Sequence, residues 1–122
     1  MRKESFSLVE LLIVVIIIGI LAAIAIPTYL KTKESVFDKE AITGLKALQV
    51  GEKSYKYDTG TYYPSAGSDS NLGSINHELH VALQSSAWTY TVYSTGCVQA
   101  VRTGKAWFLI ITNNEPTTGS CS

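Results

Sequence analysis

Apolar side chains fill the first quarter of the chain. Residues 11–30 include 20 positions without a charged side chain. Because an α-helix rises 1.5 Å per residue, this segment would extend about 30 Å, the thickness of the hydrocarbon core of a membrane. Glu10 is the single charged residue between residues 6 and 27. The pattern predicts a helix that can span a membrane and that carries one acid near its start.

Beyond Pro27 the apolar residues become periodic. They recur in steps of three, four or seven, which marks one face of a helix, at Leu30, Phe37, Ala41, Leu45, Leu48 and Tyr55. Most charged residues, including Glu52, are expected off this face, and Gly44 and Gly51 are expected to weaken the helix by about 1 kcal/mol each. We therefore predict one long helix over residues 6–57, with a hydrophobic span at 6–30 and an amphipathic part at 31–57.

Residues 58–87 are rich in helix breakers and small polar side chains. Asp58, Gly60, Pro64 and Gly67 end the long helix, and Ser, Gly and Asn dominate as far as Ser74. We expect an exposed surface loop here. A short helix is expected within residues 74–86.

From Trp88 the apolar period changes to two. Three segments alternate in this way, "WTYTVYS", "CVQAVRT" and "AWFLIIT", and Gly-containing turns separate them. Residues 88–122 are therefore predicted to form an antiparallel sheet of about three strands and a C-terminal loop. So small a sheet needs an apolar cover, which the amphipathic part of the long helix can supply. The predicted fold class is α+β.

The charge and cysteine content limit the classes of function that the chain can have. The formal net charge is zero and Lys and Arg are scattered singly, so we predict no nucleic-acid partner. Cys97 and Cys121 have neither zinc-site nor redox-motif spacing, in a chain that begins with an export-like segment. A disulfide formed outside the cytoplasm fits best. On the chain-entropy model, closing this loop contributes roughly 3.5 kcal/mol.

No arrangement of residues typical of catalysis is found in the sequence. His77, Glu78 and His80 lack the His-Glu-x-x-His spacing of zinc proteases, and no glycine-rich phosphate loop is present. We therefore expect no enzyme, no metal site and no cofactor.

The N-terminal segment admits two plain interpretations. It could be a signal peptide, with Arg2 and Lys3 as its basic start and a cut after Ala25 that releases a soluble module. Its apolar run is longer than the usual 7 to 15 residues, however, and Glu10 has no role there. It could also be a single-span anchor, but such an anchor gains nothing from an acid.

A third interpretation uses every residue of this segment. "ESFSLVELLIVVIIIGILAAIAIP" resembles the N-terminus of type IV pilins and of the related type II secretion pseudopilins. The resemblance implies that residues 1–5 are a prepilin leader, that a prepilin peptidase cuts between Ser5 and Phe6, and that the new Phe6 amine is methylated. Ser5 stands where the family has Gly. Glu10 becomes the fifth residue of the mature chain, as in the family.

The family mechanism gives these residues roles in assembly. The Glu10 carboxylate of one subunit would face the Phe6 amine of a neighbour, because a buried charge needs a partner. Gly19 and Pro27 would bound a stretch of helix that loosens in the filament. Equally, Gly19 could serve close packing and Pro27 a bend.

The resemblance also implies location and partners. The precursor would be a single-pass inner-membrane protein that meets the peptidase and a pilus assembly platform, and the mature chain a homopolymer in an extracellular helical filament. The pair Cys97–Cys121 matches the C-terminal disulfide loop typical of these pilins. Ser122 is a candidate O-glycosylation site or a plain disordered end. A type II secretion pseudopilin and a competence pilin remain alternatives.

Overall fold

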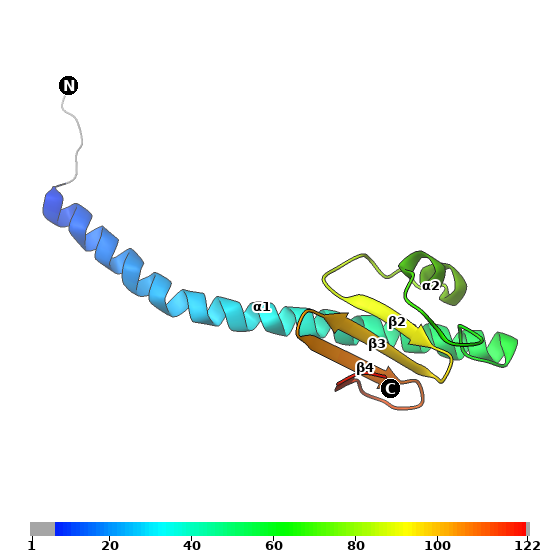
Figure 1. The fold of residues 1–122 in the computed structure, drawn as a ribbon. Coiled ribbons are helices and arrows are strands. Elements are labelled where there is room, and N and C mark those ends of the chain that lie inside the picture. Colours follow the sequence, from blue (N-terminus) through cyan, green and yellow to red (C-terminus); the bar gives the residue numbers. More distant parts are fainter. Residues whose placement is uncertain (1–6, 122) are drawn as a thin grey trace, which may run out of the picture. The chain divides into compact units, whose positions relative to one another are not determined.

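The computed structural model describes residues 7–121. Along the chain the elements are α1 (Leu8–Thr59), β1 (Ser68–Asp69), α2 (Leu72–Leu79), β2 (Thr89–Tyr93), β3 (Cys97–Arg102), β4 (Lys105–Ile110) and β5 (Thr117–Thr118) (Figure 1). The chain divides into an N-terminal unit, Met1–Val36, and a second unit, Phe37–Ser122, which we call the sheet unit. Helix α1 contributes residues to both.

The sheet is antiparallel throughout, in the order β1-β2-β3-β4-β5. Its centre is the β2-β3-β4 meander, in which Thr91 lies opposite Gln99 and Gln99 lies opposite Phe108. These are the three strands that the alternating pattern predicts, and the α+β fold class is confirmed. The edge strands β1 and β5 were not predicted, because two residues are too few to show a period of two.

The core of the sheet unit lies between α1 and one face of the sheet, and the long strands run along one side of this part of α1 (Figure 1). Ala41, Leu45 and Leu48 are fully buried, as the helical period predicts. Phe37 and Tyr55 pack against the core from its edge. From the sheet and its following loop come Val92, Val98, Ala100, Leu109 and Ile111, all nearly or fully buried.

Two glycines of α1 are part of this packing. A Cβ on Gly44 would lie 2.6 Å from the Tyr90 ring, and one on Gly51 would lie 3.0 Å from the Cβ and the carbonyl oxygen of Leu79. From the sequence, both glycines were expected only to weaken the helix. That view was incomplete, because the missing side chains let β2 and the end of α2 approach the helix backbone closely.

Glu52 corrects a second expectation. It was expected off the apolar face, yet its side chain is fully buried. Its Oε1 accepts a hydrogen bond from the Tyr63 N–H at 3.1 Å, while its Oε2 has no hydrogen-bond partner. Burial raises the pKa of this carboxyl from 4.5 to about 7, although the Tyr63 N–H opposes the rise.

Helix α2 begins at Leu72, two residues before the expected segment. The Asn71 side chain caps it by accepting a hydrogen bond from the Ser74 N–H at 3.0 Å, which satisfies a free donor of the first turn. Ile75 and Leu79 are buried in the core. The short helix therefore closes the core rather than lying free on the surface.

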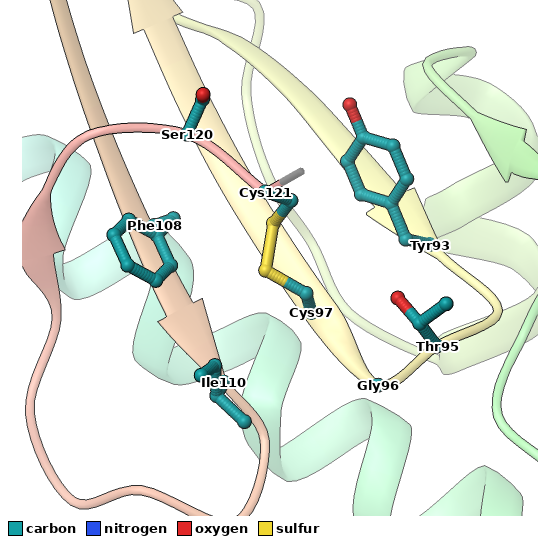
Figure 2. A pocket seen from close by; sticks show the side chains of 8 residues that line it. All are labelled: Tyr93, Thr95, Gly96, Cys97, Phe108, Ile110, Ser120 and Cys121. Carbon is teal, nitrogen blue, oxygen red and sulfur yellow. A yellow bond between two sulfur atoms is a disulfide. The ribbon is translucent and has the colours of Figure 1, made fainter.

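The disulfide joins Cys97, at the start of β3, to Cys121 in the tail (Figure 2). The predicted pairing is confirmed. Since Val98 and Leu109 face α1, the alternation of a strand places Cys97 and Phe108 on the opposite face of the sheet. The tail lies there, where the Cys121 N–H donates to Gln99 Oε1 at 3.0 Å. An open hollow of about 460 Å³ adjoins the disulfide.

Candidate assembly surface on the N-terminal helix

Helix α1 begins with a side-chain cap. The Glu10 N–H donates to Ser7 Oγ at 3.1 Å, and the Leu11 N–H donates to the Ser7 carbonyl oxygen at 3.0 Å. Ser7 is thus the N-cap, and Glu10 occupies the third helical position, where a carboxylate is favoured by the helix dipole. This cap was not predicted from the sequence. Its signal, Ser-x-x-Glu before an apolar run, stands in the sequence.

An exposed apolar surface follows the cap. From residue 8 to residue 30 the large apolar side chains expose between 42% of their surface, at Val14, and 86%, at Leu8. By length and composition this part of α1 can cross a membrane, with a mean hydropathy of 3.2 over its most apolar 18 residues. An apolar surface of this size needs lipid or other apolar helices around it. The apolar helix fits a membrane-anchored precursor.

Glu10 lies within this surface, and its side chain is exposed. The next charged residue along α1 is Lys31, nearly six turns away. Once lipid or other helices cover the surface, the carboxylate at residue 10 loses its water and needs a cationic or hydrogen-bonding partner.

Gly19 and Pro27 both lie inside continuous α-helix. A Cβ on Gly19 would meet nothing within 4 Å, so no contact within the described chain requires a glycine there. Pro27 has no N–H to donate to the carbonyl four residues earlier, and the Thr28 hydroxyl donates to the Ile24 carbonyl at 3.4 Å next to this gap. Loosening of residues 19–27 in a filament stays a prediction.

Ser5, Phe6 and Ser122 lie outside the described residues. Leader cleavage, methylation and glycosylation at these positions therefore stay predictions. His77 Nδ1 lies 3.4 Å from Glu78 Oε1 on the exposed surface of α2. Over residues 7–121, no three His, Cys, Asp or Glu side chains come together as a metal site.

Residues 1–26 match the family model described as the prokaryotic N-terminal methylation motif. The chain carries this motif. The match covers Ser5, Phe6, Glu10 and Gly19 and ends one residue before Pro27. It confirms the resemblance to type IV pilins and pseudopilins that the sequence indicates.

Two kinds of relative are similar in sequence to this chain. The type IV major pilin protein PilA of Myxococcus xanthus is 49% identical over 61 residues, which are 50% of this chain and 28% of the relative. The type II secretion system core protein G of Vibrio cholerae is 40% identical over 63 residues, or 51% and 43% of the two chains. Its Escherichia coli counterpart is 31% identical over 61 residues, or 50% and 42%. The match therefore spans less than half of each of these relatives.

No solved structure gives a significant match to the chain.

Proposed function

We propose that this protein is the structural subunit of a type IV pilus, and that it polymerises through the apolar first part of α1. The observation that carries the proposal is an exposed apolar helix whose first part lies within the methylation motif and holds one acid, Glu10, near its start. The similarity to the Myxococcus xanthus type IV major pilin supports it. The role is structural rather than enzymatic.

Processing would prepare the helix for assembly. A prepilin peptidase would remove residues 1–5 from the membrane-anchored precursor, and methylation of Phe6 would follow. The new Phe6 amine would then be four residues before Glu10 and directly before Ser7, the N-cap of α1. An assembly platform would draw the processed subunit from the inner membrane into an extracellular filament.

Two forces would act in the filament. Packing of the apolar helices removes their exposed side chains from lipid or water, and burial from water is worth about 25 cal/mol per Å². This contribution does not fix the register of the helices. The Glu10 carboxylate would select one register, because it is paired only where it meets the Phe6 amine of a neighbouring subunit. Helices in any other register would leave both charges buried and unpaired.

The type II secretion pseudopilin is the second candidate, and the 40% identity to the Vibrio cholerae core protein G favours it. It shares the apolar helix, the methylation motif and the Glu10 mechanism. Electron microscopy of cell-surface filaments, with and without this chain, separates the two: long surface fibres that disappear with the chain identify a pilin. A competence pilus would instead show loss of DNA uptake.

The Ser7 cap allows a sharp test of Glu10. Glu10→Gln keeps a residue type that serves at the third position of a capping box but removes the charge, whereas Ser7→Ala removes the cap and keeps the charge. We expect Glu10→Gln to reduce the number of filaments about tenfold or more, as loss of one buried charge pair predicts, and Ser7→Ala to assemble. Normal fibres from Glu10→Gln would contradict the mechanism.

The mature N-terminus gives an independent check by mass spectrometry. N-methylated Phe6 is expected. A chain that starts at Ile26 would indicate an ordinary signal peptide, and one that keeps Met1 would indicate a plain membrane anchor.

A further inference from the structure

The buried carboxyl of Glu52 holds part of the surface loop in place. Its side chain exposes no surface, and its Oε1 accepts a hydrogen bond from the Tyr63 N–H at 3.1 Å. Its Oε2 is also buried and has no hydrogen-bond partner within residues 7–121. Burial costs a neutral carboxyl little compared with a carboxylate whose oxygen is left unpaired. The site of Glu52 therefore fits the protonated form and not the ionised one.

Residues 61–66, which we call the Tyr63 segment, lie between this carboxyl and the solvent. The Tyr63 N–H contacts Glu52, while residues 62–64 are half-buried and the rest of the segment is exposed. The segment follows the end of α1, and Glu52 lies two turns before that end. Outward displacement of the Tyr63 segment is therefore the shortest way to bring water to the carboxyl.

The backbone of the Tyr63 segment is weakly held. Within residues 7–121 it makes no backbone–backbone hydrogen bond, and the nearest such bonds belong to Gly60 and Gly67, which bound the segment. The Gly60 N–H donates to the Lys56 carbonyl oxygen at 2.7 Å, and the Gly67 carbonyl oxygen accepts from the Ser94 N–H at 2.9 Å. Both glycines have positive φ, 90° and 73°, a region that other residues rarely adopt. A glycine at each end of a loosely bonded segment suits local opening.

Charged groups around Glu52 also favour its neutral form while the segment is closed. Asp69 accepts a hydrogen bond from the Tyr63 hydroxyl at 2.6 Å, and this bond, with a smaller contribution from Glu78, raises the pKa of Tyr63 to about 12. Both carboxylates repel a further negative charge nearby. The titratable residues on the elements next to Glu52 are Lys53, Tyr55, Lys56 and Asp58 of α1, Tyr62, Tyr63 and Asp69 of the loop, and Glu78 and the C-cap His80 of α2, while the turn 94–96 carries none.

Lys56 gives the ionised form a partner once the segment opens. In the closed position its Nζ lies 4.5 Å from the centre of the Tyr62 ring. It follows Glu52 by four residues on α1, which is the spacing and the order in which Glu and Lys pair best on a helix. Opening removes the Tyr62 ring and frees the ammonium group for the carboxylate.

We propose that ionisation of Glu52 releases the Tyr63 segment, which moves outward about Gly60 and Gly67. The segment is closed in acid and opens above neutral pH. Opening changes the surface that the sheet unit presents without unfolding the sheet. The inference goes beyond the proposed filament function and does not depend on it.

The direction of the response follows from the pKa of Glu52. Burial raises this pKa from 4.5 to about 7 while the segment is closed, and an open, hydrated carboxyl should return towards 4.5. The closed form therefore holds a proton that the open form has released, so a rise in pH favours opening. Between pH 6 and pH 8 the ratio of open to closed chains should rise about tenfold.

Hydrogen exchange in the full-length chain in detergent tests the opening. The Tyr63 N–H is followed by NMR at pH 6 and pH 8, and its rate is corrected for the pH dependence of exchange in free peptides. We expect its protection to fall about tenfold at pH 8. Low concentrations of urea should leave this exchange unchanged, because a local opening exposes little surface, while amides of β3 and β4 should exchange faster.

Glu52→Gln is the matched variant. Its amide oxygen can still accept the Tyr63 N–H, but the side chain carries no charge at either pH. The Tyr63 amide of this variant should keep at pH 8 the protection that it has at pH 6. Glu115→Gln removes an exposed carboxylate instead and should respond to pH as the native chain does. The urea dependence of the native chain tests the local opening without any variant.

Two results would overturn the proposal. A Tyr63 amide that exchanges at the rate of the β3 and β4 amides, and that responds to urea as they do, would mean that only complete unfolding frees it. A tenfold change that persists in Glu52→Gln would belong to another titratable group. Neither result bears on the proposed pilin function, which is tested on filaments.

Discussion

Gly44 of α1 lies directly beneath the ring of Tyr90 from β2. A Cβ at residue 44 would come within 2.6 Å of ring carbons, closer than non-bonded atoms approach. The Tyr90 hydroxyl reaches past this point to the Glu40 carbonyl oxygen, at 3.4 Å. Burial raises the pKa of this hydroxyl from 10.0 to about 12, so it stays protonated and can donate throughout the physiological range. The distance between helix and sheet is thus set by a residue without a side chain.

Gly44→Ala should therefore destabilise the sheet unit. Overpacking of a rigid ring costs about 1 to 3 kcal/mol, and the gain in helix propensity returns about 1 kcal/mol. A Cβ at 2.6 Å from a rigid ring places this site at the upper end of that range, so we expect a net loss of about 2 kcal/mol. The midpoint should fall by about 8 to 16 °C for a unit of this size. Thermal unfolding of the full-length chain in detergent, followed by tryptophan fluorescence, measures it.

Thr43→Ala is the control for this prediction. It makes a helix-favouring change at the neighbouring exposed position, and its midpoint should stay within about 2 °C of the native value or rise. An unchanged or raised midpoint in Gly44→Ala would show that the helix and sheet can separate at no cost.

Glu52 should make stability depend on pH. Its pKa is raised in the folded chain to about 7, so between pH 4.5 and 7 the folded state holds a proton that the unfolded state has released. The stabilisation is complete below pH 4.5 and is lost as the pH rises through 7. At about 1.4 kcal/mol for each unit of pKa, the loss is about 3 kcal/mol. Denaturant unfolding at pH 5, 6, 7 and 8 would follow it.

Glu52→Gln should flatten this dependence, since an amide does not titrate. The exposed Glu115 offers a matched control, and Glu115→Gln should keep the native slope. If Glu52→Gln loses stability with pH as steeply as the native chain, another group is responsible.

Loss of the disulfide should loosen the tail. Replacing Cys97 and Cys121 together by serine opens a loop of about 25 residues and should cost roughly 3.5 kcal/mol. The Cys121 N–H bond to Gln99 should go with it, so hydrogen exchange at residues 117–121 should speed up more than in β2 and β3. A reductant should reproduce these changes in the native chain and have no effect on the double variant.

The ion pairs Asp38–Lys105 and Lys46–Glu115 both link α1 to the second half of the chain, and they differ in burial. Lys105 Nζ lies 2.7 Å from Asp38 Oδ1, with both side chains about a quarter to a third exposed, whereas the Lys46–Glu115 pair is mostly exposed at 3.4 Å. Asp38 also accepts from the Trp107 indole N–H at 3.4 Å. We expect Asp38→Asn to cost about 1 to 2 kcal/mol and Glu115→Gln less than about 0.5 kcal/mol.

Unfolding of both variants at low and high salt checks this difference. The Glu115 effect should vanish at 1 M salt, where exposed charges are screened, and much of the Asp38 effect should remain. Equal costs for the two substitutions would mean that burial does not strengthen the Asp38–Lys105 pair.

Local patterns predicted the elements of this protein well. The uncharged run of residues 11–30 indicated the apolar helix, and the three-and-four spacing of Ala41, Leu45 and Leu48 identified the helix face that meets the sheet. Alternation identified β2, β3 and β4. Each of these signals repeats over several turns or residues, so one unusual side chain does not obscure it. The strands β1 and β5 are too short to repeat anything.

The candidate assembly surface could also be predicted from the sequence, because its main features lie close together along the chain. Glu10 stands in a fixed position relative to Phe6 and to the apolar run, whatever the rest of the chain does. The hydrogen bond from the Glu10 N–H to Ser7 Oγ was not predicted, although the Ser-x-x-Glu spacing is present in the sequence.

What the sequence by itself determined is the apolar helix, its single acid and the alternation of the strands, all of which follow from spacing along the chain. Only the tertiary structure decided that Gly44 admits Tyr90, that Gly51 meets Leu79 and that Glu52 is buried beneath Tyr63. Tyr90 and Leu79 are remote in sequence from the glycines that they contact. Tyr63 is linked to Glu52 through the irregular turn at the end of α1. Whether a residue is buried depends on which distant segment packs against it. The local spacing of apolar residues carries no information about that segment.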